Sequence, residues 1–222
     1  ILGFMVATGF LSMWISNTAC AMMMVPIGLA VISQIAELVK DQPGIDVRQG
    51  HFNFGTALML GIAYSASLGG VGTIIGTPPN AILVGIINTM FNQNISFFEF
   101  MMYGVPVAWI GIFCAWFILT RISCPLGIKS IPGGMAVIDE EYKRLGKRSY
   151  EETVVAIVFA VVAIMWIIRG FVFDKIGLGG VDDTVIAVFG AAILFLIPSS
   201  KKGKFIMNWQ AAAKAPFGIL LL

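Results

Sequence analysis

Charged residues are scarce in this chain. Only 12% of its 222 residues are charged, 58% are hydrophobic, and the formal net charge is +2. A soluble domain is typically about 25% charged and about 45–50% apolar. The composition therefore excludes a soluble globular domain and indicates a membrane protein.

The residues on which most soluble enzymes depend are also scarce. One histidine and three widely separated cysteines indicate neither a histidine-based metal site, a catalytic triad nor a disulfide framework. No basic segment precedes an apolar run, so no secretory signal is visible. We therefore expect no enzyme activity, no organic cofactor and no nucleic-acid partner. Because the chain starts at Ile1 and stops at Leu222 within an apolar run, we expect an internal piece of a longer protein.

Two stretches are almost free of charge. No charged residue precedes Glu37, and the only charged residue between Arg48 and Arg121 is Glu99. About 20 apolar residues cross a bilayer, and a straight helix over residues 1–36 would measure roughly 54 Å against a hydrocarbon core of about 30 Å. Both stretches must therefore turn back or break.

The first stretch carries polar residues near its middle, at Ser12 and at Ser16-Asn17-Thr18. A re-entrant helical hairpin over residues 1–36, with Ser16-Asn17-Thr18 at its tip, accounts for both the length and the polar cluster. Irregular backbone at that depth requires surrounding protein or a water-filled cavity. The alternative is one tilted span whose hydroxyls bond back to their own helix.

The second stretch, residues 54–98, is interrupted by glycines and by Pro78-Pro79. Glycine permits non-helical angles, and proline lacks the N–H and disfavours helix at the preceding residue. These residues predict a broken helix with halves near 55–68 and 78–91. A kink that serves only packing is the alternative. The interrupting glycines are Gly69, Gly70, Gly72 and Gly76.

Further apolar spans are expected at about 103–121, 153–169 and 184–197. Basic residues gather between residues 122 and 152 and between 198 and 215, whereas residues 92–102 contain none and are expected to form an outer loop. By the positive-inside rule, the two basic segments and the connector at 37–53 are cytoplasmic. Residues 205–215 form either an interfacial amphipathic helix or a solvated loop.

The polar residues at the two breaks suit a cation and an anion. Ser12 and Ser16 are four residues apart, so on a helix their hydroxyls share one face, and Asn17 adds a carbonyl oxygen. Such oxygens hold hard cations together with backbone carbonyls freed by unwinding, so we expect a sodium site. Helix starts near Thr18 and Pro78 would offer free N–H groups and a positive dipole end to an anion. Neither break contains Arg or Lys, so a bound dianion would need cations that enter with it.

Residues 61–80 read GIAYSASLGGVGTIIGTPPN. Together with Ser12 and Ser16-Asn17-Thr18, this string resembles the divalent anion/sodium symporter family, which includes bacterial sodium-dependent dicarboxylate transporters. The resemblance implies an all-α polytopic membrane protein with two inverted repeats, each with a re-entrant hairpin and a broken helix. It also implies a homodimer and an elevator mechanism, in which hairpins and broken helices carry the site across the bilayer.

The resemblance also implies roles for individual residues. Those that resemble the ligands of a sodium site are Ser12, Ser16, Asn17 and, through its carbonyl, Gly76. Those that resemble one half of a carboxylate-binding site are Ser16, Asn17, Thr18 and Thr77. Pro78 and Asn80 belong to the motif and are weaker candidates for direct contact.

The family's organisation implies a division of the chain into five parts. In order, they are the hairpin of the first repeat (1–36), a cytoplasmic connector (37–53), the broken helix and final helix of that repeat (54–122), a cytoplasmic loop (123–152) and the truncated first helices of the second repeat (153–222). The second Ser-Asn-Thr hairpin is absent from the sequence, so we expect half of the binding site here.

We therefore expect a protein of the bacterial cytoplasmic membrane that couples sodium entry to uptake of C4 dicarboxylates such as succinate, malate or fumarate. Its expected partners are the dicarboxylate anion, sodium ions, the lipid bilayer and, in the full-length protein, a second copy. Sodium-independent dicarboxylate exchange and transport of another divalent anion, such as citrate or sulfate, are the alternatives within transport. An ion channel lined by the broken helices is an alternative of another class.

Overall fold

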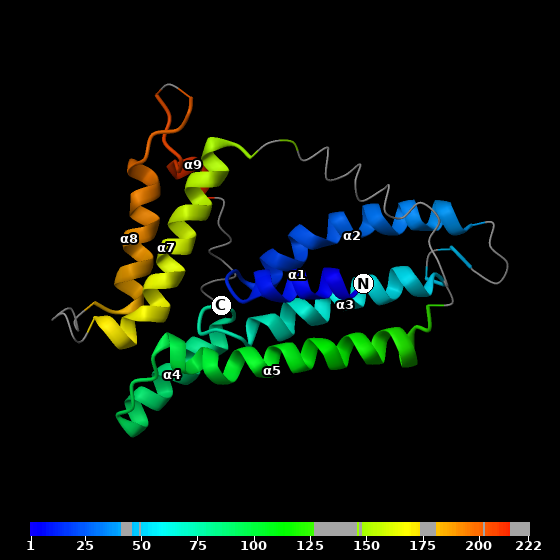
Figure 1. Ribbon diagram of the computed structural model, residues 1–222, viewed down its shortest axis with the longest axis horizontal. Helices are drawn as coiled ribbons and strands as arrows, with labels where there is room; N and C mark the ends of the chain where they lie inside the picture. The colour runs from blue at the N-terminus through cyan, green and yellow to red at the C-terminus, as the bar shows by residue number, and fades with distance from the viewer. Residues whose placement is uncertain are drawn as a thin grey trace. The chain divides into compact units, whose positions relative to one another are not determined.

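The computed structural model describes residues 1–40, 46–48, 50–126, 146, 148–173, 181–201 and 203–213. Apart from one isolated β-bridge between Pro198 and Phe205, every regular element in these residues is helical. The chain divides into two compact units (Figure 1). The first comprises Ile1–Ile95 with Glu99–Arg144, and the second comprises Ser96–Phe98 with Leu145–Leu222.

The helices that form most of the first unit are α1 (Leu2–Ser12), α2 (Asn17–Val39), α3 (Asn53–Gly70), α4 (Pro78–Phe91) and α5 (Phe97–Ile118), which continues into the π-helical turn η1 (Leu119–Ser123). The non-helical residues 71–77 separate α3 from α4, so the predicted break of the second stretch is confirmed. The first stretch is also broken, since residues 13–16 separate α1 from α2.

α1 runs along α3 in the same direction. A Cβ added at Gly61 would lie 3.0 Å from Met5, and one added at Gly72 would lie 3.0 Å from Met13. The closest approach is between two backbones, because a Cβ at Gly69 would lie 2.2 Å from the Gly9 carbonyl oxygen. Only glycine at position 69 permits this packing.

α2 runs back along the same helix. A Cβ at Gly28 would meet Ile62 at 2.8 Å, and one at Gly55 would meet Ile32 at 3.2 Å. The chain therefore reverses at residues 13–16 and forms a helical hairpin against α3 (Figure 1). The alternative of a single tilted span over residues 1–36 is wrong.

α5 is longer than expected. It begins at Phe97 rather than near residue 103. The prediction that residues 92–102 form an outer loop is therefore wrong for residues 97–102, which are helical. Glu99 explains the early start, because an acidic residue in the first turn interacts favourably with the positive end of the helix dipole.

At the other end of the unit, Asn53 Nδ2 donates to the Pro125 carbonyl oxygen over 2.9 Å. The start of α3 and the end of η1 thus lie at the same end, as the expected cytoplasmic placement of residues 37–53 and 122–152 requires.

The second unit is built on α7 (Tyr150–Val172) and α8 (Asp183–Leu196), so the helices predicted at 153–169 and 184–197 are confirmed with small shifts. Arg169 Nη1 pairs with Asp183 Oδ1 at 3.0 Å where the two helices are joined. At their other end, the Glu151 carboxylate accepts from Ser199 Oγ at 2.7 Å. The pair is therefore tied by polar contacts at both ends.

Other expectations for this region fall largely outside the described residues. In the described part of 205–215, the only helix is the one-turn helix α9 (Trp209–Ala212). Residues 214–222, with the apolar run after Pro216, are not described. Most of the basic segment 123–152 also lies outside the described residues.

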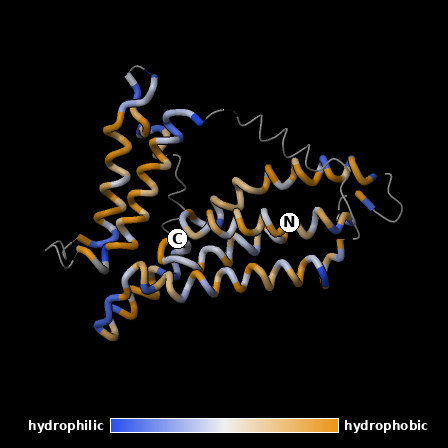
Figure 2. Tube along the Cα trace, viewed as in Figure 1, coloured by the Kyte–Doolittle hydropathy of each residue, from blue (hydrophilic) through white to orange (hydrophobic). Residues whose placement is uncertain are grey.

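Three of the described helices are long and apolar enough to cross a membrane: Asn17–Val39, Phe97–Ser123 and Tyr150–Arg169. Figure 2 shows hydrophobic residues along the helices and hydrophilic ones mainly at their ends and in the turns. Large apolar side chains such as Met22, Ile82 and Met90 are more than half exposed. Lipid or further protein must cover such faces. With eleven residues, or about 16 Å, α1 is too short to cross by itself.

Candidate functional site

The candidate site lies where the two helix breaks meet. The C-terminal ends of α1 and α3 and the N-terminal end of α2 come together there, with residues 13–16 on one side and 71–77 on the other. Helix C-terminal ends and unwound carbonyls favour a cation, whereas a helix N-terminal end favours an anion. The backbone alone therefore offers opposite polarities at neighbouring positions.

Asn17 is at the centre of this arrangement. One atom of its terminal amide lies 2.8 Å from Ser12 Oγ, 3.0 Å from the Ala66 carbonyl oxygen and 3.2 Å from the Gly76 carbonyl oxygen. Ser12 Oγ also lies 2.6 Å from the Ala66 carbonyl oxygen, so its single proton can be donated to that carbonyl or, where the amide atom is an oxygen, to Asn17. If the amide atom is Nδ2, it can donate to these oxygens. If it is Oδ1, four oxygens lie close together and share only the Ser12 proton, an arrangement that a cation among them would stabilise.

With Asn17 Oδ1 in this position, the four oxygens form a neutral ligand set. They are two side-chain oxygens, from Ser12 and Asn17, and two backbone carbonyls, from Ala66 and Gly76. Hard cations prefer oxygen ligands, but calcium sites usually include carboxylates, which are missing here. The described residues also contain no group of three or more His, Cys, Asp or Glu side chains able to hold a metal ion. The set suits a monovalent hard cation such as sodium.

The structure brings together three of the four candidate sodium ligands, namely Ser12, Asn17 and the Gly76 carbonyl. Ser16 lies at the same turn but caps α2, and its Oγ accepts from Ala19 N at 3.3 Å. The expectation that Ser12 and Ser16 share one helical face is wrong, because α1 ends at Ser12.

The start of α2 opens onto a cavity of about 530 Å³. Asn17 and Thr18 line it from α2, and Ser67 faces them from α3. With Ser16 as the cap, the N–H groups of Asn17 and Thr18 have no acceptor among the described residues and are available to an anion. The remaining lining residues are Ala21, Met22, Val25, Pro26, Ala63 and Ala66.

The start of α4 differs from this pattern. Pro78 and Pro79 occupy its first two positions and have no N–H, and Asn80 N donates to the Thr77 carbonyl oxygen at 3.1 Å. The expectation that this start offers free N–H groups is therefore wrong, and only the dipole of α4 remains. Thr77 occupies the N-cap position, but its hydroxyl makes no capping bond. It does not line the cavity beside Asn17 and Thr18.

Asn80 and Thr73 support the second break. Asn80 Nδ2 donates to the carbonyl oxygens of Gly70 at 2.9 Å and Thr73 at 2.8 Å. Sequence reasoning ranked Asn80 low for ligand contact and did not single out Thr73, the Ala66 carbonyl or Ser67. All three lie within the string at 61–80, but helical spacing alone does not reveal which of its polar atoms face the first break.

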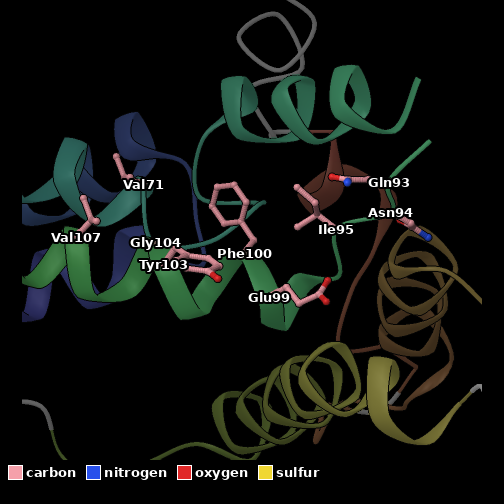
Figure 3. A pocket seen from close by; sticks show the side chains of 9 residues that line it. All are labelled: Val71, Gln93, Asn94, Ile95, Glu99, Phe100, Tyr103, Gly104 and Val107. Carbon is pink, nitrogen blue, oxygen red and sulfur yellow. The ribbon is translucent and has the colours of Figure 1, made fainter. Parts of the chain in front are cut away.

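A second cavity, of about 660 Å³, lies between the turn after α4 and α5 (Figure 3). Gln93, Asn94, Glu99 and Tyr103 supply its polar side chains. It contains none of the candidate site residues, and its only ionisable acid, Glu99, would repel an anion. We therefore do not assign the anion to this cavity.

The sequence profile of the sodium:sulfate symporter transmembrane region matches residues 1–222. The chain belongs to this family. Members of the sodium:sulfate symporter family are transporters, so the expectation that the chain is not an enzyme is confirmed. Family membership and the three membrane-length helices make the chain part of an integral membrane protein.

Two relatives of this chain carry the same name. The chain is 42% identical over 225 residues to the sodium-dependent dicarboxylate transporter SdcS of Staphylococcus saprophyticus. It is 39% identical over 225 residues to SdcS of Staphylococcus aureus strain NCTC 8325. Both alignments cover 100% of this chain but 43% of the relative, so the chain spans less than half the length of these relatives. The resemblance to sodium-dependent dicarboxylate transporters that was based on the motifs is thereby confirmed.

Proposed function

We propose that the protein containing this chain is a sodium-coupled symporter of C4 dicarboxylates, such as succinate, malate or fumarate, in the bacterial cytoplasmic membrane. The observation that carries the proposal is the neutral oxygen cluster of Ser12, Asn17 and the Gly76 carbonyl beside the free N–H groups that begin α2. The names of the two SdcS relatives support sodium and a dicarboxylate as substrates.

Asn17 couples the two substrates in this proposal. With sodium bound, Oδ1 faces the ion, and Nδ2 turns toward the cavity as a donor for a carboxylate. Without sodium, Nδ2 donates to Ser12 and to the carbonyls of Ala66 and Gly76, and Oδ1 faces the cavity and repels an anion. The chain has no Arg or Lys at the two breaks to offset that repulsion.

The broader arrangement follows the family resemblance. We propose that α1 and α2 form a re-entrant hairpin and that residues 1–122 and 153–222 belong to two inverted repeats. A second Ser-Asn-Thr hairpin outside this chain would complete the anion site, and the full-length protein would work as a homodimer by an elevator movement. The proposed anion ligands in this half are Asn17 and Thr18, which line the cavity at the start of α2, with Ser16 supporting the turn. Thr77 stays a predicted ligand, although it does not line that cavity.

Uptake by the full-length protein in proteoliposomes tests the proposal. An inward sodium gradient should drive uphill accumulation of labelled succinate, and replacing external sodium with choline should abolish it. Equal uptake in both media would establish sodium-independent exchange or another mechanism instead. Because the family description names sulfate, sulfate and citrate are added as competitors, and stronger inhibition by either than by malate or fumarate would overturn the C4 preference. Uphill accumulation would also exclude a channel.

Ser12→Ala and Thr18→Ala should each weaken the binding of a different substrate. The first removes a buried hydroxyl from the sodium cluster, and the second removes an exposed hydroxyl from the anion cavity. A hydrogen bond contributes about 1 kcal/mol, or roughly fivefold in affinity. Ser12→Ala should therefore raise the half-saturating sodium concentration, and Thr18→Ala the half-saturating succinate concentration, by roughly fivefold each. Uptake titrations of both substrates measure this, and unchanged values in both variants would contradict the assignment.

A further inference from the structure

Thr73 joins the two helix breaks. Its side chain is fully buried, and its hydroxyl donates to the Met13 carbonyl oxygen at the end of α1. Thr73 Oγ1 also accepts a hydrogen bond from Gly76 N at 3.0 Å. One hydroxyl thus holds the loop that presents the Gly76 carbonyl and ties that loop to the turn of the hairpin.

Asn80 holds the same loop from the side of α4. Its Nδ2 donates to the carbonyl oxygens of Gly70 and Thr73, which flank the first residues of the loop at 71–77. The loop is folded tightly onto the end of α3, because a Cβ at Gly76 would lie 2.4 Å from the Gly70 carbonyl oxygen. The Thr73 hydroxyl and the Asn80 amide thus use their polar hydrogens in hydrogen bonds to backbone carbonyls.

We propose that Thr73 and Asn80 are positioning residues for the sodium site, acting through the Gly76 carbonyl without touching the ion. This inference rests on the proposed function, because it takes the oxygen cluster around Asn17 as the sodium site. The two side chains keep the Gly76 carbonyl within 3.2 Å of the Asn17 amide. Without them, the loop samples other conformations, and sodium binds only the fraction in which the carbonyl faces Asn17.

Loosening the loop should weaken the binding of sodium rather than the binding of the anion. The apparent dissociation constant rises in inverse proportion to the competent fraction, so loosening the loop weakens sodium binding. An excess of sodium selects the competent conformation and restores it. At saturating sodium, the anion therefore meets an intact site even in a variant that lacks the Thr73 hydroxyl.

Thr73→Val removes both hydrogen bonds at nearly constant shape and is the first test. Sodium-dependent thermal stabilisation of the purified full-length protein, with choline as the balancing ion and no anion substrate, measures sodium binding directly. The half-saturating sodium concentration should rise about tenfold, which is about 1.4 kcal/mol. Thr73→Ser, which keeps the hydroxyl, should stay near the wild-type value. Thr89→Val is the matched control, because the Thr89 hydroxyl donates to the Gly85 carbonyl of its own helix at 2.9 Å.

Asn80→Leu is the second test, because it removes both donated hydrogen bonds at similar size and adds no charge, and Asn88→Leu on an exposed part of α4 is its control. Asn80→Leu should also weaken sodium binding about tenfold, while Asn88→Leu should not. At saturating sodium, succinate uptake by Thr73→Val should have a wild-type half-saturating succinate concentration. Three results would overturn the inference alone: wild-type sodium binding in both Thr73→Val and Asn80→Leu, a loss of sodium binding in Thr73→Ser equal to that in Thr73→Val, or a loss of succinate affinity that persists at saturating sodium. Absence of any sodium-dependent stabilisation in the wild type would overturn the proposed function and this inference with it.

Discussion

Asn17→Asp should abolish dicarboxylate uptake by the full-length protein and leave sodium binding intact. The substitution keeps the shape of the side chain but removes its N–H donors and adds a negative charge. A carboxylate oxygen can still face a cation beside Ser12 and the carbonyls of Ala66 and Gly76. Two like charges about 4 Å apart repel by on the order of 4 kcal/mol at an effective dielectric constant of about 20. That energy corresponds to about a thousandfold loss of anion affinity.

Two measurements separate the effects of this variant. Succinate uptake should fall to the level of empty proteoliposomes, whereas sodium-dependent thermal stabilisation should have a half-saturating concentration no higher than in the wild type. Asn92→Asp adds the same charge at an exposed residue in the turn that ends α4 and should retain uptake. Persistent uptake by Asn17→Asp with a wild-type succinate requirement would show that this side chain does not face the anion.

Gly69→Ala should prevent the hairpin from packing on α3. A Cβ at this position would lie 2.2 Å from the Gly9 carbonyl oxygen and 2.7 Å from its Cα, and backbone atoms cannot rotate aside. Overpacking usually destabilises by about 1–3 kcal/mol, and a backbone collision belongs at or beyond the upper end. The apparent melting temperature and the folded yield of the full-length protein should both fall sharply. Sodium-dependent stabilisation should disappear, because the Ser12 contact to Ala66 depends on the same packing.

Gly3→Ala provides the matched control for this substitution. Gly3 lies on α1, and a Cβ there would have no atom within 4 Å. Alanine also favours a helix over glycine by about 1 kcal/mol, so this variant should fold at least as well as the wild type. Equal stability of Gly69→Ala and Gly3→Ala would show that α1 and α3 do not approach as closely as described.

The helices and their breaks could largely be predicted from the sequence, because their causes are local. Pro78-Pro79 and the preceding glycines prevent a helix through 71–77, and the helix after that break begins at Pro78 as expected. The ends of helices were harder to predict where apolar residues continue past a loop. α5 starts at Phe97 because Glu99 stabilises its first turn, which average hydropathy does not reveal.

The site could be predicted only in part, because its geometry depends on contacts between segments far apart in the sequence. The meeting of Ser12 and Asn17 is local, but their contacts to the Ala66 and Gly76 carbonyls arise only when α1 packs on α3. The role of Thr73 was not visible, since its partner Met13 lies 60 residues earlier. The division into inverted repeats and the individual ligand roles remain predictions that these contacts motivate.

The coupling of sodium to the anion at Asn17 is tested most directly by equilibrium binding of labelled succinate to the purified full-length protein. The dissociation constant is measured in saturating sodium and in choline at equal ionic strength. Coupling between two binding sites is reciprocal, so a shared Asn17 amide requires the anion to bind far more tightly when sodium is present. We predict at least a tenfold lower dissociation constant in saturating sodium than in choline. At the sodium concentration that half-saturates the wild type, the difference should be smaller in Ser12→Ala than in the wild type. The same succinate affinity in sodium and in choline would contradict the account.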